Sequence, residues 1–135
     1  MKILLDTHIF LWLIHKNKLL SKEVIELINN PKNEIFLSVV SIWECVIKYQ
    51  ISKLNFPESP ELYLPKKREE YLIESLIIDE GSIKNLIDLP LLHKYPFDRL
   101  LISQSLQHNL TFITEDNVIL QYPNIKVFNQ DNQNI

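Results

Sequence analysis

The sequence predicts an α/β fold in which a mainly parallel β-sheet lies between helices. Short apolar runs suited to buried strands alternate with longer segments of helical periodicity, a pattern typical of parallel sheets covered on both faces. The chain has 135 residues, enough for one domain, and its 46% hydrophobic content allows a substantial core. We therefore expect a single α/β domain over residues 1–128, followed by a polar tail at 129–135 that frays.

Five segments have the length and apolar composition of short strands. The first, Lys2–Leu5, ends in Asp6 and is predicted to be a buried strand that leads into a turn. The others are Glu34–Leu37, Leu76–Ile78, Thr111–Ile113 and Lys126–Phe128. We expect a sheet of four to five strands from these segments.

The segments between the strands have helical signals. The segment 7–15 is too long and too apolar to be another strand. Its composition predicts a helix that is packed on both sides. Ser21 suits the N-cap of an amphipathic helix that Asn29-Asn30-Pro31 ends, and Pro96 suits the first position of a helix over residues 97–108. Further helices are expected from Ser38 or Ser41 to about Gln50, over residues 66–76, near 82–88 and briefly at 115–121, with turns or loops at 57–65 and 90–96.

The composition excludes several classes of protein. Gly81 is the only glycine, so the chain has neither a P-loop nor a glycine-rich dinucleotide loop. Cys45 is the only cysteine, which excludes an internal disulfide and a cysteine-based zinc site. No apolar run approaches the roughly 18 residues of a membrane span, and Asp6 interrupts the apolar start of the chain, so we expect a cytoplasmic location without a membrane partner.

Four carboxylates are predicted to lie near one edge of the sheet. Ligands of open parallel sheets bind beyond the carboxyl ends of the strands. Asp6 ends the first strand, Asp116 follows the fourth, and Asp98 lies in the first turn of the helix after Pro96, whose start should face the same edge. Glu44 has mostly apolar neighbours in its helix, so it faces either solvent or a polar site. Without these four acids the net charge of −3 becomes −3 + 4 = +1, so the charge alone does not exclude a nucleic-acid substrate.

Each acid also has a structural explanation. Asp6 would serve as a helix N-cap, and Asp98 or Asp116 would favour the positive end of a helix dipole. Glu44 would form an ordinary ion pair with Lys48, four residues further on. Position in the chain leaves both interpretations open.

Four blocks of sequence occur in an order that is specific in combination. They are Leu4-Leu5-Asp6-Thr7-His8 with Leu11-Trp12; Ser41-Ile42-Trp43-Glu44 with Lys48; Leu89-Pro90 and His93 before Pro96-Phe97-Asp98-Arg99-Leu100-Leu101-Ile102; and Thr114-Glu115-Asp116. Together they resemble the PIN-domain toxins related to VapC, from Lys2 to Phe128. Related sequences usually carry an Asp where this chain has Tyr95; because Asp98 is the acid carried over to the metal site, we expect activity to survive.

The resemblance implies a three-layer α/β/α sandwich and an endoribonuclease that depends on Mg²⁺ or Mn²⁺. It also implies an RNA substrate, a cognate antitoxin that blocks the site, and a homodimer. Asp6 and Asp98 would be the principal metal ligands, Asp116 a ligand directly or through water, and Glu44 the residue that orients or activates the attacking water. Mg²⁺ prefers oxygen ligands, and clustered acids repel one another unless a cation neutralises them.

Four further residues are candidates for contacts in the site. Thr7 and Thr114 would orient the carboxylates by hydrogen bonds, although both would also serve as plain helix caps. Arg99 and Lys48 would each neutralise a phosphate or pair with a nearby acid. We expect the histidines not to be ligands, Trp12 and Trp43 to lie in the core, and the run Lys66-Lys67-Arg68 to be a solvated helix face.

Two rival functions fit parts of the pattern. A PIN fold that binds RNA or protein without cutting would share the same blocks, although the presence of all four acids counts against a degenerate site. A receiver or phosphatase domain also has an acidic sheet edge, but the phosphatase pattern needs a second Asp two residues after Asp6, where this chain has His8.

Overall fold

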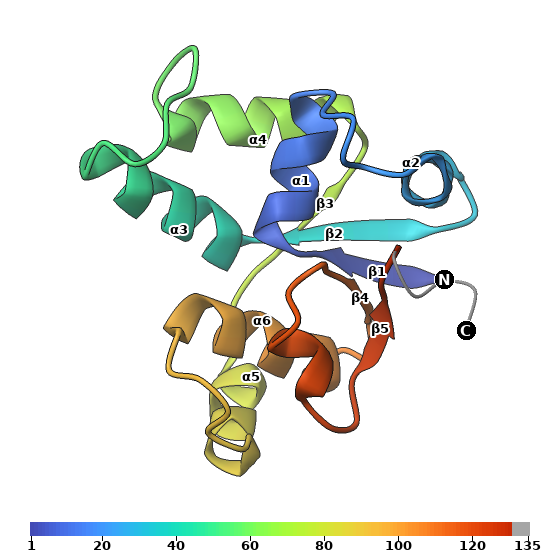
Figure 1. Cartoon of the computed structure of the whole chain (residues 1–135), viewed down its shortest axis with the longest axis vertical. Coiled ribbons are helices and arrows are strands. Elements are labelled where there is room, and N and C mark those ends of the chain that lie inside the picture. Colours follow the sequence, from blue (N-terminus) through green and yellow to red (C-terminus); the bar gives the residue numbers. More distant parts are fainter. Residues whose placement is uncertain (131–135) are drawn as a thin grey trace.

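The computed structural model describes residues 1–130, which form a five-stranded parallel sheet with helices on both faces (Figure 1). The strands are β1 (Lys2–Leu5), β2 (Glu34–Ser38), β3 (Glu74–Leu76), β4 (Thr111–Ile113) and β5 (Lys126–Phe128). Their order in the sheet is β3-β2-β1-β4-β5, and every neighbouring pair is parallel. The predicted α/β sandwich with a parallel sheet of four to five strands is confirmed.

The helices begin where the sequence supplies caps. They are α1 (Thr7–Ile14), α2 (Lys22–Asn29), α3 (Val39–Gln50), α4 (Pro60–Glu70), α5 (Glu80–Asn85) and α6 (Pro96–Gln107), with 3₁₀ turns η1 (Leu86–Asp88) and η2 (Ile119–Gln121). Ser21 caps α2 by accepting a hydrogen bond from the Val24 amide at 3.2 Å. Of the two serines proposed to open α3, Ser38 is the cap and accepts from the Val40 amide at 3.0 Å.

Alternate residues of the strands face opposite layers of the sandwich. Ile3 and Leu5 of β1 pack with α1, α2 and α4 in one core cluster, whereas Leu4 packs with α6 in the other. Phe112 and Ile113 of β4 divide between the clusters in the same way. Strands of a parallel sheet are buried on both faces, which explains why these runs are continuously apolar rather than alternating with polar residues.

Helix α4 begins six positions before the predicted start at residue 66 and contains Pro65. Proline lacks the amide hydrogen that an interior helical position normally donates, so Pro65 is a local signal against a helix. The turn predicted for residues 57–65 is therefore wrong from Pro60 onward. Pro60 at the first helical position starts the helix, and Leu64, 1% exposed, packs into the core beside Pro65. Burial of a leucine side chain contributes about 2 kcal/mol, which offsets much of the cost of the interior proline.

Two further predicted elements lie elsewhere than expected. Strand β3 spans Glu74–Leu76 instead of residues 76–78, because pairing with β2 sets Phe36 opposite Glu74 and Ser38 opposite Leu76. The short helix predicted for 115–121 shrinks to η2, since the Asp116 carboxylate accepts from the Val118 amide at 2.8 Å and forms a turn there.

The start of the predicted polar tail is hydrogen-bonded to the domain. Asn129 donates through Nδ2 to the Thr114 carbonyl at 3.0 Å, and the Gln130 amide donates to Glu115 Oε1 at 3.1 Å. The predicted fraying is therefore wrong for these two residues, and positions 131–135 of the predicted tail lie outside the described residues. In residues 1–130 no helix has the length and apolar character that a membrane crossing requires.

Candidate functional site

The pairing of β1 with β4 brings Asp6 and Thr114 together. Leu5 lies opposite Ile113 in this register. The next residue of each strand, Asp6 or Thr114, therefore lies just beyond the carboxyl edge of the sheet. Thr114 Oγ1 donates to Asp6 Oδ2 at 2.6 Å, and the Thr7 amide donates to Asp6 Oδ1 at 2.8 Å. Asp6 is thus both the N-cap of α1 and a buried carboxylate at this edge. Thr114 makes the contact expected of a residue that orients Asp6.

The Thr7 hydroxyl connects two helices at the same place. Thr7 Oγ1 donates to Ser41 Oγ at 2.8 Å, which ties the first turn of α1 to the first turn of α3. The sequence offered Thr7 as a donor to a carboxylate or a plain cap. Its backbone amide contacts Asp6, while its side chain fixes the start of the helix that carries Glu44 and helps to lower the pKa of that carboxyl.

Glu44 points into the protein. It is 2% exposed, and its Oε2 accepts hydrogen bonds from Lys48 Nζ at 2.9 Å and from the Tyr95 hydroxyl at 2.7 Å. Its other oxygen, Oε1, is buried and has no hydrogen-bond partner among residues 1–130. Burial opposes ionisation of Glu44, but the Tyr95, Lys48 and Thr7 side chains outweigh it and lower the pKa of this carboxyl. The predicted ion pair with Lys48 therefore exists, but on the site side of α3 rather than on its surface.

Asp98 has a carboxyl group whose pKa is raised well above its ordinary value. Burial is the main cause that raises the pKa of Asp98 to about 7, and repulsion by Asp6, Asp116 and Glu44 adds to it. Burial likewise raises the pKa of Asp6. The four acids thus lie close enough for their charges to oppose one another. The sheet-edge argument placed Asp6, Asp98 and Asp116 there but left the direction of Glu44 open.

Asp116 is anchored by the backbone around it. Its Oδ1 accepts from the Val118 amide at 2.8 Å, and its own amide donates to Thr114 Oγ1 at 3.1 Å. Thr114 therefore bonds to both Asp6 and Asp116, so one hydroxyl links two acids from different strand ends. Asp116 Oδ1 thus accepts from the two amides, of Val118 and Ile119, that lead into η2.

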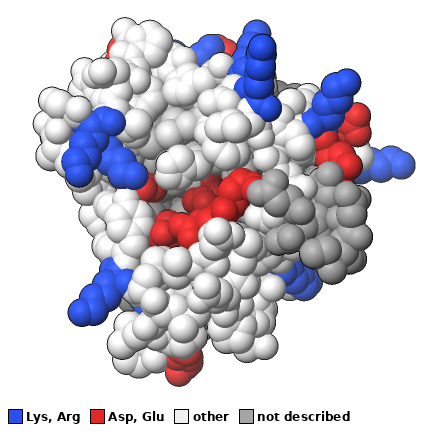
Figure 2. Space-filling model, viewed as in Figure 1, with Lys and Arg blue, Asp and Glu red and all other residues white. Residues whose placement is uncertain are grey.

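Acidic side chains gather in a hollow at the centre of the molecular face drawn in Figure 2, where β1 leads into α1 above α6 in Figure 1. Within residues 1–130, no group of three or more acid, histidine or cysteine side chains is spaced to hold a metal ion as it stands. The donor chemistry nevertheless fits Mg²⁺, because this ion takes one or two carboxylates and keeps several waters. The buried, unpartnered Oε1 of Glu44 is an acceptor that a cation or its water would satisfy.

Sequence reasoning missed a chain of polar contacts behind Asp98. His93 Nε2 lies 3.3 Å from Asp98 Oδ2, and His93 Nδ1 lies 2.7 Å from the Tyr122 hydroxyl. Arg99 donates through Nη1 to the same hydroxyl at 3.2 Å and to the Pro90 carbonyl at 2.8 Å. Arg99 thus pairs with backbone and phenol oxygens rather than with an acid. The position of His93 before the Pro-Phe-Asp-Arg block was the one signal that pointed to this contact.

Three expectations for residues outside the site have different outcomes. Trp43 is 48% exposed and packs edge-on against Phe97 with 4.8 Å between ring centroids, so its placement in the core is wrong. Trp12 is partly buried against the first core cluster, as predicted. In the basic run, Lys66 is exposed as expected, but Arg68 folds back and donates to the Ile73 carbonyl at 2.7 Å.

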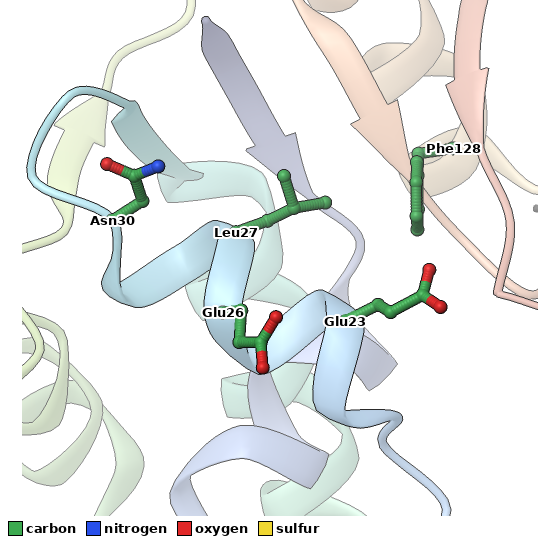
Figure 3. A pocket seen from close by; sticks show the side chains of 5 residues that line it. All are labelled: Glu23, Glu26, Leu27, Asn30 and Phe128. Atoms are coloured by element: carbon green, nitrogen blue, oxygen red, sulfur yellow. The ribbon is translucent and has the colours of Figure 1, made fainter.

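A separate pocket lies between α2 and β5 (Figure 3). It is lined by Glu23, Glu26, Leu27, Asn30 and Phe128. The carboxylate of Glu23 and the ring of Phe128 face each other across it. None of the four predicted site acids lines this pocket, so it is distinct from the acidic hollow.

The fold and the acidic sheet edge agree with a known family. The model of the PIN domain matches residues 3–125 of this chain. The chain therefore belongs to the PIN domain family, and the resemblance noted in the sequence is confirmed at that level. PIN domains are generally nucleases that use divalent metal ions, so the class defined by fold and site is a hydrolase acting on nucleic acid.

Solved structures with a similar fold include toxin–antitoxin complexes. VapBC2 from Rickettsia felis, bound to a DNA fragment from its promoter, matches with a TM-score of 0.72 and 23% identity over 96% of this chain and 98% of that chain. DNA-bound VapBC from Salmonella typhimurium matches with a TM-score of 0.69 and 19% identity over 96% and 98% of the two chains. FitAcB from Neisseria gonorrhoeae matches with a TM-score of 0.61 and 18% identity over 94% and 96%. A comparison with curated protein sequences gives no match.

Proposed function

We propose that this protein is a divalent-metal-dependent endoribonuclease and the toxin of a toxin–antitoxin pair. The observation that carries the proposal is the convergence of Asp6, Glu44, Asp98 and Asp116. Burial is the main cause that raises the pKa of Asp98 to about 7, and repulsion by the other three acids adds to it. Clustered acids are unfavourable as pure structure, and a bound cation would relieve their repulsion. The PIN family membership supports nuclease chemistry at this cluster.

The residues divide into ligands and supports. Asp6 and Asp98 would hold Mg²⁺ or Mn²⁺, with Asp116 as a ligand directly or through water. When bound, the ion would neutralise charge on the RNA phosphate and lower the pKa of water. Glu44 would orient the attacking water and accept its proton, because its lowered pKa keeps it ionised at neutral pH.

The proposed partners are an RNA substrate, a cognate antitoxin and a second copy of the chain in a homodimer, all in the cytoplasm. A solved toxin–antitoxin complex from Klebsiella pneumoniae has a chain of the same fold, with a TM-score of 0.61 and 17% identity over 93% of this chain and 95% of that chain. Large apolar side chains exposed on this protein, such as Leu72 at 88% and Leu91 at 79%, are available to protein partners.

One observation favours a different function, an RNA- or protein-binding module without nuclease activity. In the described residues the acids are not spaced to hold a metal ion as they stand. A module of this kind would bind its partner equally well with and without divalent metal, and removal of Asp6 would leave binding intact.

Asp6→Asn separates these two functions. We expect the change to reduce Mg²⁺-dependent cleavage of RNA by about 100-fold or more, because loss of even an outer-shell contact to a metal site costs 10–100-fold. The measurement is cleavage of a labelled RNA by purified protein with Mg²⁺ and with EDTA. Asp88→Asn, at an exposed acid of η1, is the matched control and should cleave like the wild type. Equal cleavage by Asp6→Asn and wild type would rule out the assignment of this site.

The toxin role predicts an effect on growth. Expression of the wild-type chain without its antitoxin should arrest cells, and Asp98→Asn should relieve the arrest at equal protein level. Colony counts after induction, with immunoblots for protein amount, measure this. An arrest that Asp98→Asn leaves undiminished would place the toxic activity outside the acidic hollow.

A further inference from the structure

Tyr95 contacts the site from the start of α6. Its hydroxyl donates to Glu44 Oε2 at 2.7 Å, and its ring packs edge-on against Phe97 with 5.5 Å between centroids. Tyr95 occupies the N-cap position of α6 but makes no side-chain capping hydrogen bond. Its polar atom is therefore directed to Glu44 and not to its own helix.

Two donors hold the same oxygen of Glu44. Lys48 Nζ lies 2.9 Å from Oε2, and this ammonium group also lies 5.7 Å from the centroid of the Tyr95 ring. A carboxylate is planar, so donors that fix one oxygen from two directions also fix the direction of the other. Oε1 is that other oxygen, and it is buried without a hydrogen-bond partner among the described residues.

The two donors are not equivalent. A lysine ammonium is a compact charge on a flexible stem and sets no strict direction for its partner. The Tyr95 phenol is rigid, and its ring contacts both Phe97 and the Lys48 ammonium. The phenol is thus the contact that fixes the plane of the Glu44 carboxylate. An ionised carboxylate at position 95 would have no proton to donate to Glu44.

We propose that Tyr95 is a positioning residue that holds Glu44 Oε2 and thereby keeps Oε1 free for the metal ion or its water. The inference rests on the proposed metal-dependent function and adds a residue that supports Glu44. Tyr95 acts through Glu44 and does not itself contact the substrate. A tyrosine whose role is only to pack on Phe97 would be replaced by Phe without loss.

The test combines Tyr95→Phe with Glu44→Gln. Phe keeps the ring and removes only the hydroxyl, so we expect the melting temperature to stay within a few degrees of wild type. Mn²⁺ affinity, measured by titration calorimetry, should fall about 10-fold in Tyr95→Phe, in the range found for outer contacts of metal sites. In cleavage, kcat should fall while KM stays unchanged. Tyr49→Phe, at an exposed tyrosine near the end of α3, is the control and should match wild type in both assays.

The Glu44→Gln background decides whether Tyr95 acts through Glu44. If it does, Tyr95→Phe should change Mn²⁺ affinity by less than about 2-fold once Glu44 is replaced, because the two changes are not independent. Equal Mn²⁺ affinity and kcat in Tyr95→Phe and wild type, or the same 10-fold loss in both backgrounds, would overturn the inference while leaving the proposed function intact. A wild-type protein that neither binds Mn²⁺ nor cleaves RNA would overturn the proposed function, and the inference with it.

Discussion

Asp98→Asn is expected to stabilise the metal-free protein at pH 8 while it removes cleavage activity. Burial and the neighbouring acids raise the pKa of Asp98 from 3.8 to about 7. Since one pKa unit corresponds to about 1.4 kcal/mol, the ionised side chain costs the fold roughly 2–4 kcal/mol. Asn has a similar shape without the charge, so the free energy of unfolding at pH 8 should rise by about that amount.

The pH dependence follows from the direction of the shift. Between pH 3.8 and about 7 the folded protein binds a proton at Asp98 that the unfolded chain has released. The stability of the wild type should therefore fall as the pH rises through this window, and the penalty is complete above pH 7. Asp98→Asn should show a shallower fall, because the raised pKa of Asp6 still contributes in the same direction.

Urea unfolding of the metal-free protein at pH 5 and pH 8 measures both effects. Asp88→Asn removes an exposed acid and should keep the wild-type pH dependence. Added Mn²⁺ should restore stability at pH 8 in the wild type and have little effect on Asp98→Asn, because only the protein that binds the ion is stabilised. An Asp98→Asn variant with unchanged stability and pH dependence would show that the acids do not repel one another in the fold.

Arg99→Met is expected to destabilise the fold strongly. Arg99 donates to the Pro90 carbonyl at 2.8 Å and to the Tyr122 hydroxyl at 3.2 Å, and so joins α6 to the loop after η1. Hydrogen bonds from a charged donor contribute roughly 1.5–3 kcal/mol each, so we expect a loss of about 3 kcal/mol in the free energy of unfolding. Urea unfolding at constant pH measures this loss.

The same variant tests the alternative role of Arg99 in binding phosphate. Lys94→Met, at an exposed lysine of the neighbouring loop, removes the same charge and should change stability by less than about 0.5 kcal/mol. If Arg99 contacted a phosphate, the slope of log K for RNA binding against log salt concentration would become shallower by about one in the variant. We expect no such decrease for Arg99→Met; a smaller salt dependence with full stability would reverse the assignment.

The strand pattern was predictable because burial on both faces of a parallel sheet produces continuous apolar runs. Lys2–Leu5 and Thr111–Ile113 were predicted to the residue, and their pairing then places Asp6 beside Thr114. The start of α4 was not predictable, because Pro65 is a local signal against a helix whereas the burial of Leu64 is a tertiary effect. Local rules predicted this fold except where packing over longer range overrode them.

The site residues likewise include some that local sequence predicts and others that depend on tertiary packing. Asp6, Asp98 and Asp116 follow from their places at the sheet edge, whereas the side of α3 that faces inward depends on its packing. That packing turns Glu44 into the protein and leaves Trp43 48% exposed, the reverse of what the polarity of the two residues suggests. The contacts of Glu44 with Tyr95 and of Asp98 with His93 come from chain segments that only the fold brings together.

The measurement that tests the central claim most directly is end-group analysis of RNA cut by the purified wild-type protein with Mg²⁺. Attack of water on the phosphodiester should leave a 5′-phosphate and a 3′-hydroxyl, and both EDTA and Asp98→Asn should abolish the products. Cleavage that yields a 2′,3′-cyclic phosphate, or that persists in EDTA or in Asp98→Asn, would contradict a metal-dependent site built from the four carboxylates.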